Sequence, residues 1–103
     1  MVRYRNSRVY KIYSESSPEL IFIGSTTEKD LTRVLNNKKG AFNRWVNDMI
    51  DAYNPSYDIF IEGEAKIELI EEFPHCKSKK ELREYENQYI ERVDCVNKIE
   101  EIE

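Results

Sequence analysis

Two stretches of sequence, VYKIY at residues 9–13 and FIGST at residues 22–26, decide the fold of this chain. Hydrophobic residues alternate in both, which is typical of β-strands because successive side chains of a strand point to opposite faces. The polar residues between the two stretches suit a turn. The pattern therefore predicts a β-hairpin over residues 3–14 and 20–25, which ends in a turn at Gly24 and continues into a helix.

The alternation also assigns the side chains of the first strand to faces. Tyr10 and Ile12 share one face, and Val9, Lys11 and Tyr13 share the other. We expect Tyr13 to pack in the core, which leaves Tyr10 on the opposite side of the hairpin.

The remainder of the chain predicts three helices and two strands from the spacing of its hydrophobic residues. The expected helices span residues 28–37, 41–53 and 78–93, and the expected strands span residues 57–61 and 65–73. Gly40 separates the first two helices, and Pro55 follows the second. Residues 57–61 also fit a loop or a helical turn.

These elements predict one α+β domain over residues 1–103, which ends in an acidic tail at residues 98–103. A small antiparallel sheet, made of the N-terminal hairpin and a later strand, is expected to be flanked by helices. A chain of this length buries somewhat over ~60% of its unfolded surface. No apolar run approaches the length of a membrane span, and the first residues lack a signal-peptide core, so we expect a soluble, intracellular protein without a membrane partner.

The net charge of −4 conceals an asymmetry between the two halves of the chain. Residues 1–48 carry nine basic and five acidic residues, a balance of +4, whereas residues 49–103 carry seven basic and fifteen acidic residues, a balance of −8. A basic half beside an acidic half suggests that an anionic partner approaches the N-terminal side.

The two cysteines, Cys76 and Cys95, are too few for a disulfide framework and are expected to be reduced thiols. A zinc site with His75 would need a fourth ligand and has no recognised spacing.

One acidic residue interrupts the apolar stripe of the last predicted helix. Glu86 lies four residues after Leu82 and three before Tyr89, so it shares their side of the helix. A bare charge on an apolar face is costly. Glu86 is therefore either a residue at the edge of the stripe that reaches solvent or a functional group that needs a cation, a hydrogen-bond network or an open cleft.

The ordered series of motifs in this chain resembles the GIY-YIG endonuclease superfamily, and it looks closest to the small single-domain members of large DNA viruses and phages. Val9 and Tyr10 occupy the second and third positions of the GIY motif. The sequence FIG at residues 22–24 stands for YIG and is followed by the hydroxyl-rich residues 25–27. The series then continues through the following positions: Arg33, residues 66–74 (KIELIEEFP), residues 86–90 (ENQYI) and residues 95–98 (CVNK).

The resemblance implies a metal-dependent endonuclease that hydrolyses DNA phosphodiester bonds. Glu86 would hold a single Mg²⁺ or Mn²⁺ ion, which can be bound through one carboxylate and several waters. Arg33 would clamp the scissile phosphate. Tyr10 would act as a general base or orient the attacking water. Asn97 would close the site with a hydrogen bond.

Two positions of the site depart from the family pattern. Phe22 stands where the YIG tyrosine is expected, so the site lacks one hydroxyl. Asn37 stands where many members carry His or Tyr, and an amide cannot transfer a proton at neutral pH. Arg8 in place of the first glycine of GIY removes no chemical group.

We expect the DNA to be held mainly through its backbone, which positions a strand without reading its sequence. The residues expected to contact it are Ser25, Thr26, Lys38, Lys39 and Arg44. The chain carries no appended recognition module, so low sequence specificity is expected. A homodimer would place two sites for double-strand cleavage. The alternative is a catalytically weakened member that binds nucleic acid or a protein partner.

Overall fold

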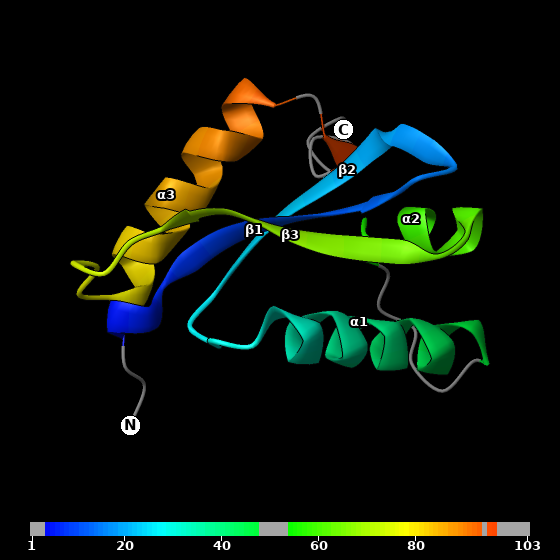
Figure 1. Ribbon diagram of the computed structural model, residues 1–103, viewed down its shortest axis with the longest axis horizontal. Helices are drawn as coiled ribbons and strands as arrows, with labels where there is room; N and C mark the ends of the chain where they lie inside the picture. Colours follow the sequence, from blue (N-terminus) through cyan, green and yellow to red (C-terminus); the bar gives the residue numbers. More distant parts are fainter. Residues whose placement is uncertain (1–3, 48–53, 94, 97–103) are drawn as a thin grey trace.

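The computed structural model describes residues 4–47, 54–93 and 95–96. Three antiparallel strands form a sheet in the order β2-β1-β3, so the strand quoted first in the sequence lies at the centre (Figure 1). The elements in chain order are η1 (Tyr4–Asn6), β1 (Arg8–Ser14), β2 (Ser17–Thr26), α1 (Leu31–Val46), α2 (Tyr57–Glu62), β3 (Ala65–Glu72) and α3 (Lys79–Arg92). The predicted α+β class, with an antiparallel hairpin, a later strand and flanking helices, is confirmed.

Helices cover both faces of the sheet, and each face has its own hydrophobic cluster. Tyr10, Ile12 and Phe22 pack against residues of α1 and α2 on one face. Val9 and Ile23 pack against the apolar side of α3 on the other face. This division confirms the faces that the alternating pattern assigned to the hairpin.

The hairpin is tighter than expected at its turn. β2 begins at Ser17, directly after the turn, and pairs from Ser14↔Ser17 through to Arg8↔Thr26. Pro18 is accommodated because β2 is an edge strand with one side free of a partner. At the other end of the hairpin, β1 begins at Arg8, and η1 stands where the extended strand was expected.

Tyr13 lies outside both clusters, contrary to the prediction that it belongs to the core. It is half-buried, and the Lys11 ammonium lies 5.4 Å from the centroid of its ring. The reason is that Tyr13, although on the face that α3 covers, lies toward the turn of the hairpin, beyond the cluster that packs against α3.

Residues 31–46 form one helix, where two helices separated by Gly40 were predicted. The apolar stripe continues at helical spacing through Val34, Leu35 and Phe42, so packing against the sheet outweighs the cost of one glycine, about 1 kcal/mol. The helix begins after Asp30, whose side chain accepts a hydrogen bond from the backbone N–H of Thr32 at 3.0 Å. The predicted continuation over residues 48–53 lies outside the described residues.

The predicted strand over residues 57–61 is wrong, because these residues begin the short helix α2. An Asx turn precedes it, in which the backbone N–H of Ser56 donates to Oδ1 of Asn54 at 2.9 Å. Ile59 and Phe60 are buried on the helical face that packs on the sheet. The helical turn that the sequence left open is therefore the correct alternative.

The last two elements agree with the sequence. β3 pairs antiparallel with β1, and Gly63, with φ of 144°, separates it from α2. Ser78 caps α3 by accepting a hydrogen bond from the backbone N–H of Glu81 at 3.1 Å. None of the helices in the described part of the chain has the length and hydrophobicity that a membrane crossing requires.

Candidate functional site around Glu86

The candidate site begins at the end of the hairpin, where Tyr10 faces Gly24 across the β1–β2 ladder. Tyr10 is only 2% exposed, and its ring lies over the glycine. A Cβ at Gly24 would lie 2.5 Å from Cζ of Tyr10, which is closer than any side chain tolerates. Gly24 is therefore required here because the tyrosine ring occupies the space of its missing side chain.

Glu86 approaches the same end of the sheet from α3. The Ser25 hydroxyl donates a hydrogen bond of 2.5 Å to Oε1 of Glu86, and the two residues are 61 positions apart in sequence. Leu82, one helical turn earlier, is buried, so the side of α3 that carries Glu86 is its inner side. Glu86 thus belongs to the sheet-facing side of its helix and has the hydrogen-bond partner that a half-buried carboxylate needs.

The charge of Glu86 acts on two further residues. Burial, and secondly the Glu86 carboxylate, raise the pKa of Tyr10 far above its ordinary value. The phenol therefore stays protonated at neutral pH and can donate a hydrogen bond. The general-base role that the sequence resemblance implied would therefore require a nearby positive charge that lowers the pKa of Tyr10 again.

Lys38 is the second residue whose pKa is affected by the charge of Glu86. Burial lowers the pKa of Lys38, and the negative charge of Glu86 opposes that shift. Its ammonium lies 5.0 Å from the centroid of the Phe22 ring, close enough for a cation–π contact. The side chain of Lys38 therefore lies across the ring at the position where the family motif would supply a hydroxyl.

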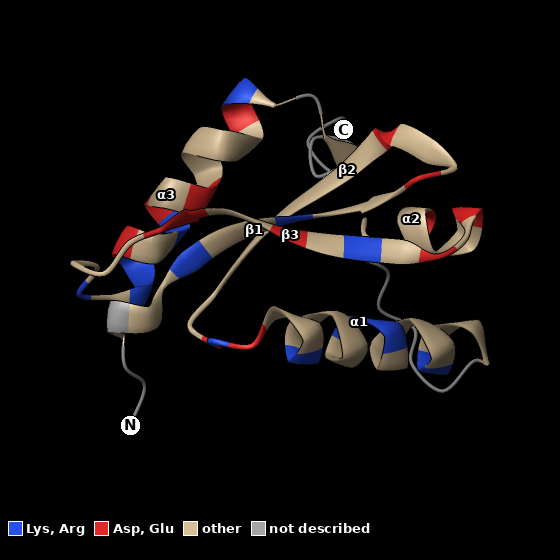
Figure 2. Ribbon diagram, viewed as in Figure 1, with Lys and Arg blue, Asp and Glu red and all other residues tan. Residues whose placement is uncertain are grey.

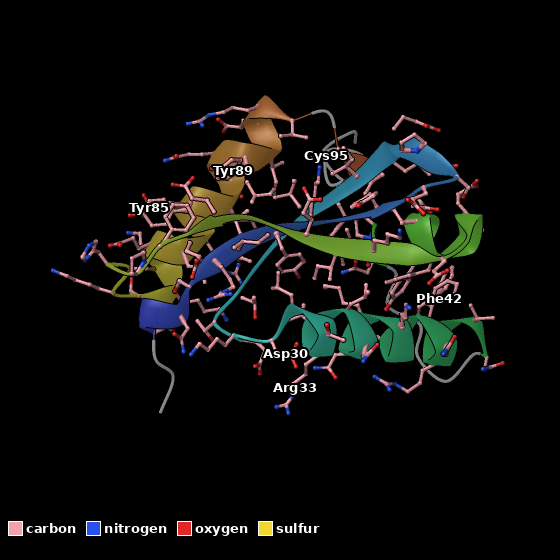
Figure 3. The ribbon with its side chains drawn as sticks, viewed as in Figure 1. Asp30, Arg33, Phe42, Tyr85, Tyr89 and Cys95 are labelled. Atoms are coloured by element: carbon pink, nitrogen blue, oxygen red, sulfur yellow. The ribbon has the colours of Figure 1, made fainter. Side chains whose placement is uncertain are left out.

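Arg33, the expected phosphate clamp, lies on the other side of the same helix. α1 carries several basic residues and no acidic residue (Figure 2). Among them, Arg33 points away from the sheet (Figure 3). Its side chain is 68% exposed, and its Nη1 lies 3.8 Å from Oε2 of Glu28. The structure does not bring Arg33 together with Tyr10 and Glu86.

The geometry of α1 explains why Lys38, and not Arg33, lies on the side of the helix that faces the sheet. Lys38 lies four residues after the buried Val34, so it shares the inner face, whereas Arg33 is rotated about 100° away from Val34. The sequence already contained this signal, because Lys38 falls within the apolar stripe of α1. Asn37, four residues after Arg33, is exposed on the outer side with it.

The other predicted contact residues are distributed more widely. Thr26 lies at the site, and its Oγ1 accepts a hydrogen bond from the backbone N–H of Glu28 at 2.9 Å, which shapes the loop before α1. Lys39 is half-buried, and Arg44 is exposed near the far end of α1. Asn97 lies outside the described residues, as does the acidic tail over residues 98–103.

A cavity of about 550 Å³ adjoins Glu86. Its lining combines the end of β2, the loop that follows, η1 and the first two turns of α3: Tyr4, Ser25, Thr26, Thr27, Lys79, Leu82, Arg83 and Glu86. The sequence reasoning missed Tyr4, Lys79 and Arg83, because their proximity depends on how η1 meets α3.

The donor set around Glu86 fits a single magnesium or manganese ion. One carboxylate oxygen, the hydroxyl of Ser25 and an adjoining open cavity leave room for the waters that Mg²⁺ retains. Among the described residues, no group of three His, Cys, Asp or Glu side chains converges. Cys76 and Cys95 are both buried, and neither is in a disulfide in the described part of the chain.

No protein-family model matches this sequence, and no curated protein and no solved structure matches it either. The resemblance to GIY-YIG endonucleases therefore stays a prediction from the sequence motifs. Any functional conclusion has to be carried by the geometry of the site itself.

Proposed function

We propose that this protein is a metal-dependent endonuclease that hydrolyses DNA phosphodiester bonds with little sequence specificity. The observation that carries the proposal is the Ser25–Glu86 hydrogen bond beside an open cavity, with Tyr10 and Lys38 near enough for the charge of Glu86 to act on both. These residues come from four elements, β1, β2, α1 and α3. Together they offer a carboxylate, two hydroxyls and a cation, which is the set that phosphodiester chemistry requires.

Glu86 would hold the divalent ion, and the hydrogen bond from Ser25 would keep its carboxylate in one rotamer. A bound Mg²⁺ or Mn²⁺ supplies charge neutralisation at the phosphate and a more acidic water. Tyr10, which remains protonated, donates a hydrogen bond to a phosphate oxygen or to the attacking water. A donor held rigidly by packing needs no reorganisation during the reaction.

Lys38 replaces Arg33 as the cation that balances the phosphate charge. Its ammonium is a point charge without the two-pronged geometry of a guanidinium, so it favours the anion without fixing its orientation. Because Lys38 is partly buried, the local dielectric is lower, and the attraction between its ammonium and the phosphate is stronger than on an exposed surface.

A second candidate is a module of the same kind that binds nucleic acid or a protein partner without cleaving it. Three observations favour it: Phe22 provides no hydroxyl, Tyr10 resists deprotonation, and Arg33 points away from the site. With DNA as the substrate, we further propose that the protein is intracellular. Double-strand cleavage would further need two sites, as in a homodimer.

Measuring cleavage and binding of the same DNA distinguishes the endonuclease from the binding module. Supercoiled plasmid is incubated with the protein and Mg²⁺ or Mn²⁺, and a gel-shift assay in EDTA measures binding to the same DNA. Metal-dependent nicking supports the endonuclease. Binding without nicking under either ion supports the binding module, and the absence of both would overturn the endonuclease and the nucleic-acid-binding form of the module together.

A further inference from the structure

The cavity beside Glu86 has a wall that the proposed cleavage chemistry does not use. Tyr4 from η1 and Lys79 and Arg83 from the start of α3 form this wall, which we call the basic wall. Residues 25–27, which carry hydroxyls at the end of β2 and in the loop that follows, line the same cavity. Lysine and arginine positions gather where η1 and the first turns of α3 meet (Figure 2).

The two cations of the basic wall are available to a ligand. Lys79 and Arg83 are four residues apart, so they lie on the same side of α3, and both are exposed. Within residues 4–47, 54–93 and 95–96, neither forms an ion pair with a carboxylate. Two such cations opposite a row of hydroxyls form a suitable site for a phosphate group.

Tyr4 adds an aromatic surface to the same recess. It is half-buried, and the backbone N–H of Ser7 closes the η1 turn by donating to the carbonyl oxygen of Tyr4 at 2.9 Å. An aromatic ring beside basic side chains is the combination by which proteins bind single-stranded nucleic acid, because a base stacks on the ring while the cations follow the backbone.

The size of the recess limits what it can hold. A volume of about 550 Å³ lies within the range of roughly 300–1,000 Å³ that is usual for small-ligand sites. This is enough for one nucleotide and too small for a base pair with both backbones. A base of a continuous duplex would have to leave the helical stack in order to reach Tyr4, which costs free energy that an unpaired base does not need.

We propose that the recess binds one unpaired nucleotide, with its phosphate between Lys79 and Arg83 and its base against Tyr4. The protein then prefers single-stranded, gapped or flapped nucleic acid to continuous duplex. The inference rests on the proposed function in one respect only, because Glu86 at the end of the recess would place the scissile phosphate next to this nucleotide.

The test is a binding titration in EDTA, where metal-dependent cleavage cannot occur. Fluorescence anisotropy follows a labelled oligothymidylate of about ten nucleotides and a duplex of the same length. The variants are Tyr4→Ala, Tyr4→Phe, Lys79→Ala and Arg83→Ala. Lys80→Ala is the matched control, since it removes the same charge from the first turn of α3 at an exposed position that does not line the cavity.

We expect wild-type protein to bind the single strand more tightly than the duplex. Tyr4→Ala should weaken single-strand binding about ten-fold, a stacking contribution that Tyr4→Phe retains. Lys79→Ala and Arg83→Ala should each weaken it clearly more than Lys80→Ala. Equal losses in all three charge variants, or an unchanged affinity in Tyr4→Ala, would overturn the proposal.

Two further outcomes separate this inference from the proposed function. Glu86-dependent nicking that is insensitive to the basic wall would contradict the nucleotide site and leave the endonuclease standing. Tyr4-dependent binding without nicking would support the nucleotide site and contradict the endonuclease. A phosphoserine peptide that competes with the oligothymidylate at equal concentration would assign the recess to a protein partner and overturn the inference.

Discussion

The hydroxyl of Ser25 and the carboxylate of Glu86 are joined by a hydrogen bond of 2.5 Å that ties the end of β2 to the middle of α3. The contact joins the hairpin to Glu86, whose charge would cost free energy on an apolar helix face if it had no partner. It therefore fixes the rotamer of Glu86 at the mouth of the cavity.

Ser25→Ala is expected to weaken metal binding and nicking by about ten-fold. Residues that orient a metal ligand typically contribute 10–100-fold to affinity or activity. Calorimetric titration with Mn²⁺ measures the binding, and plasmid nicking measures the rate. Ser25→Thr keeps the hydroxyl and should retain most of both; equal losses in the two variants would show that the hydrogen bond is not the cause.

Gly24→Ala should destabilise the protein, because the new methyl group meets the buried ring of Tyr10. Overpacking of this kind costs about 1–3 kcal/mol in the free energy of unfolding. Gly40→Ala is the matched control. Its Cβ would find only Nη1 of Arg44 at 3.6 Å, so the helix should gain about 0.5–1 kcal/mol.

Urea denaturation measures both glycine variants. A Gly24→Ala protein as stable as wild type would contradict the position of Tyr10 over the glycine, on which the orientation of its hydroxyl depends.

Lys38→Met should lower the nicking rate about a hundred-fold, whereas Arg33→Met should leave it nearly unchanged. Removal of one group that stabilises transition-state charge typically costs 10²–10³ in rate. Methionine keeps the unbranched chain over the Phe22 ring and removes only the charge. The reverse order of the two variants would restore Arg33 as the phosphate clamp and contradict the role given to Lys38.

Tyr10 should make stability depend on alkaline pH. Its pKa is raised in the folded protein, so the folded state keeps the proton at pH values where the unfolded chain has lost it. The stabilisation is complete below the ordinary value near 10 and decreases as the pH rises above it, by up to about 1.4 kcal/mol per pH unit.

Denaturation of wild type and Tyr10→Phe between roughly pH 9 and 11 tests this dependence. The difference between the two proteins should be constant below pH 10 and shift in favour of Tyr10→Phe above it. A constant difference across the whole range would mean that Tyr10 is not buried in the protonated form.

The elements that could be predicted from sequence are those specified by local pattern. The alternation around Tyr10 and the Ser78 cap each specify an element without reference to the rest of the chain. Residues 57–61 have no unambiguous period, and their burial against the sheet decides in favour of a helix. Gly40 is a weak helix breaker, and the stripe on both sides of it shows why one helix forms.

The site was harder to predict than the fold because it depends on rotation about helix axes. Glu86 could be singled out, since a carboxylate in an apolar stripe is locally anomalous. Whether Arg33 or Lys38 faces the site depends on which side of α1 packs on the sheet, and a motif match does not determine that side. Tyr4 and Arg83 line one cavity although they are far apart in sequence, so nothing local in the sequence indicates them.

The most direct test of the central claim compares Glu86→Gln with Glu84→Gln in the metal-dependent nicking of supercoiled plasmid. Glutamine preserves the shape and the acceptor for Ser25 but removes the charge that holds the ion, and Glu84 is an exposed residue two positions away on the same helix. We predict that Glu86→Gln loses at least about 100-fold in rate while Glu84→Gln nicks like wild type. Nicking that persists unchanged in Glu86→Gln would contradict a catalytic centre at Glu86.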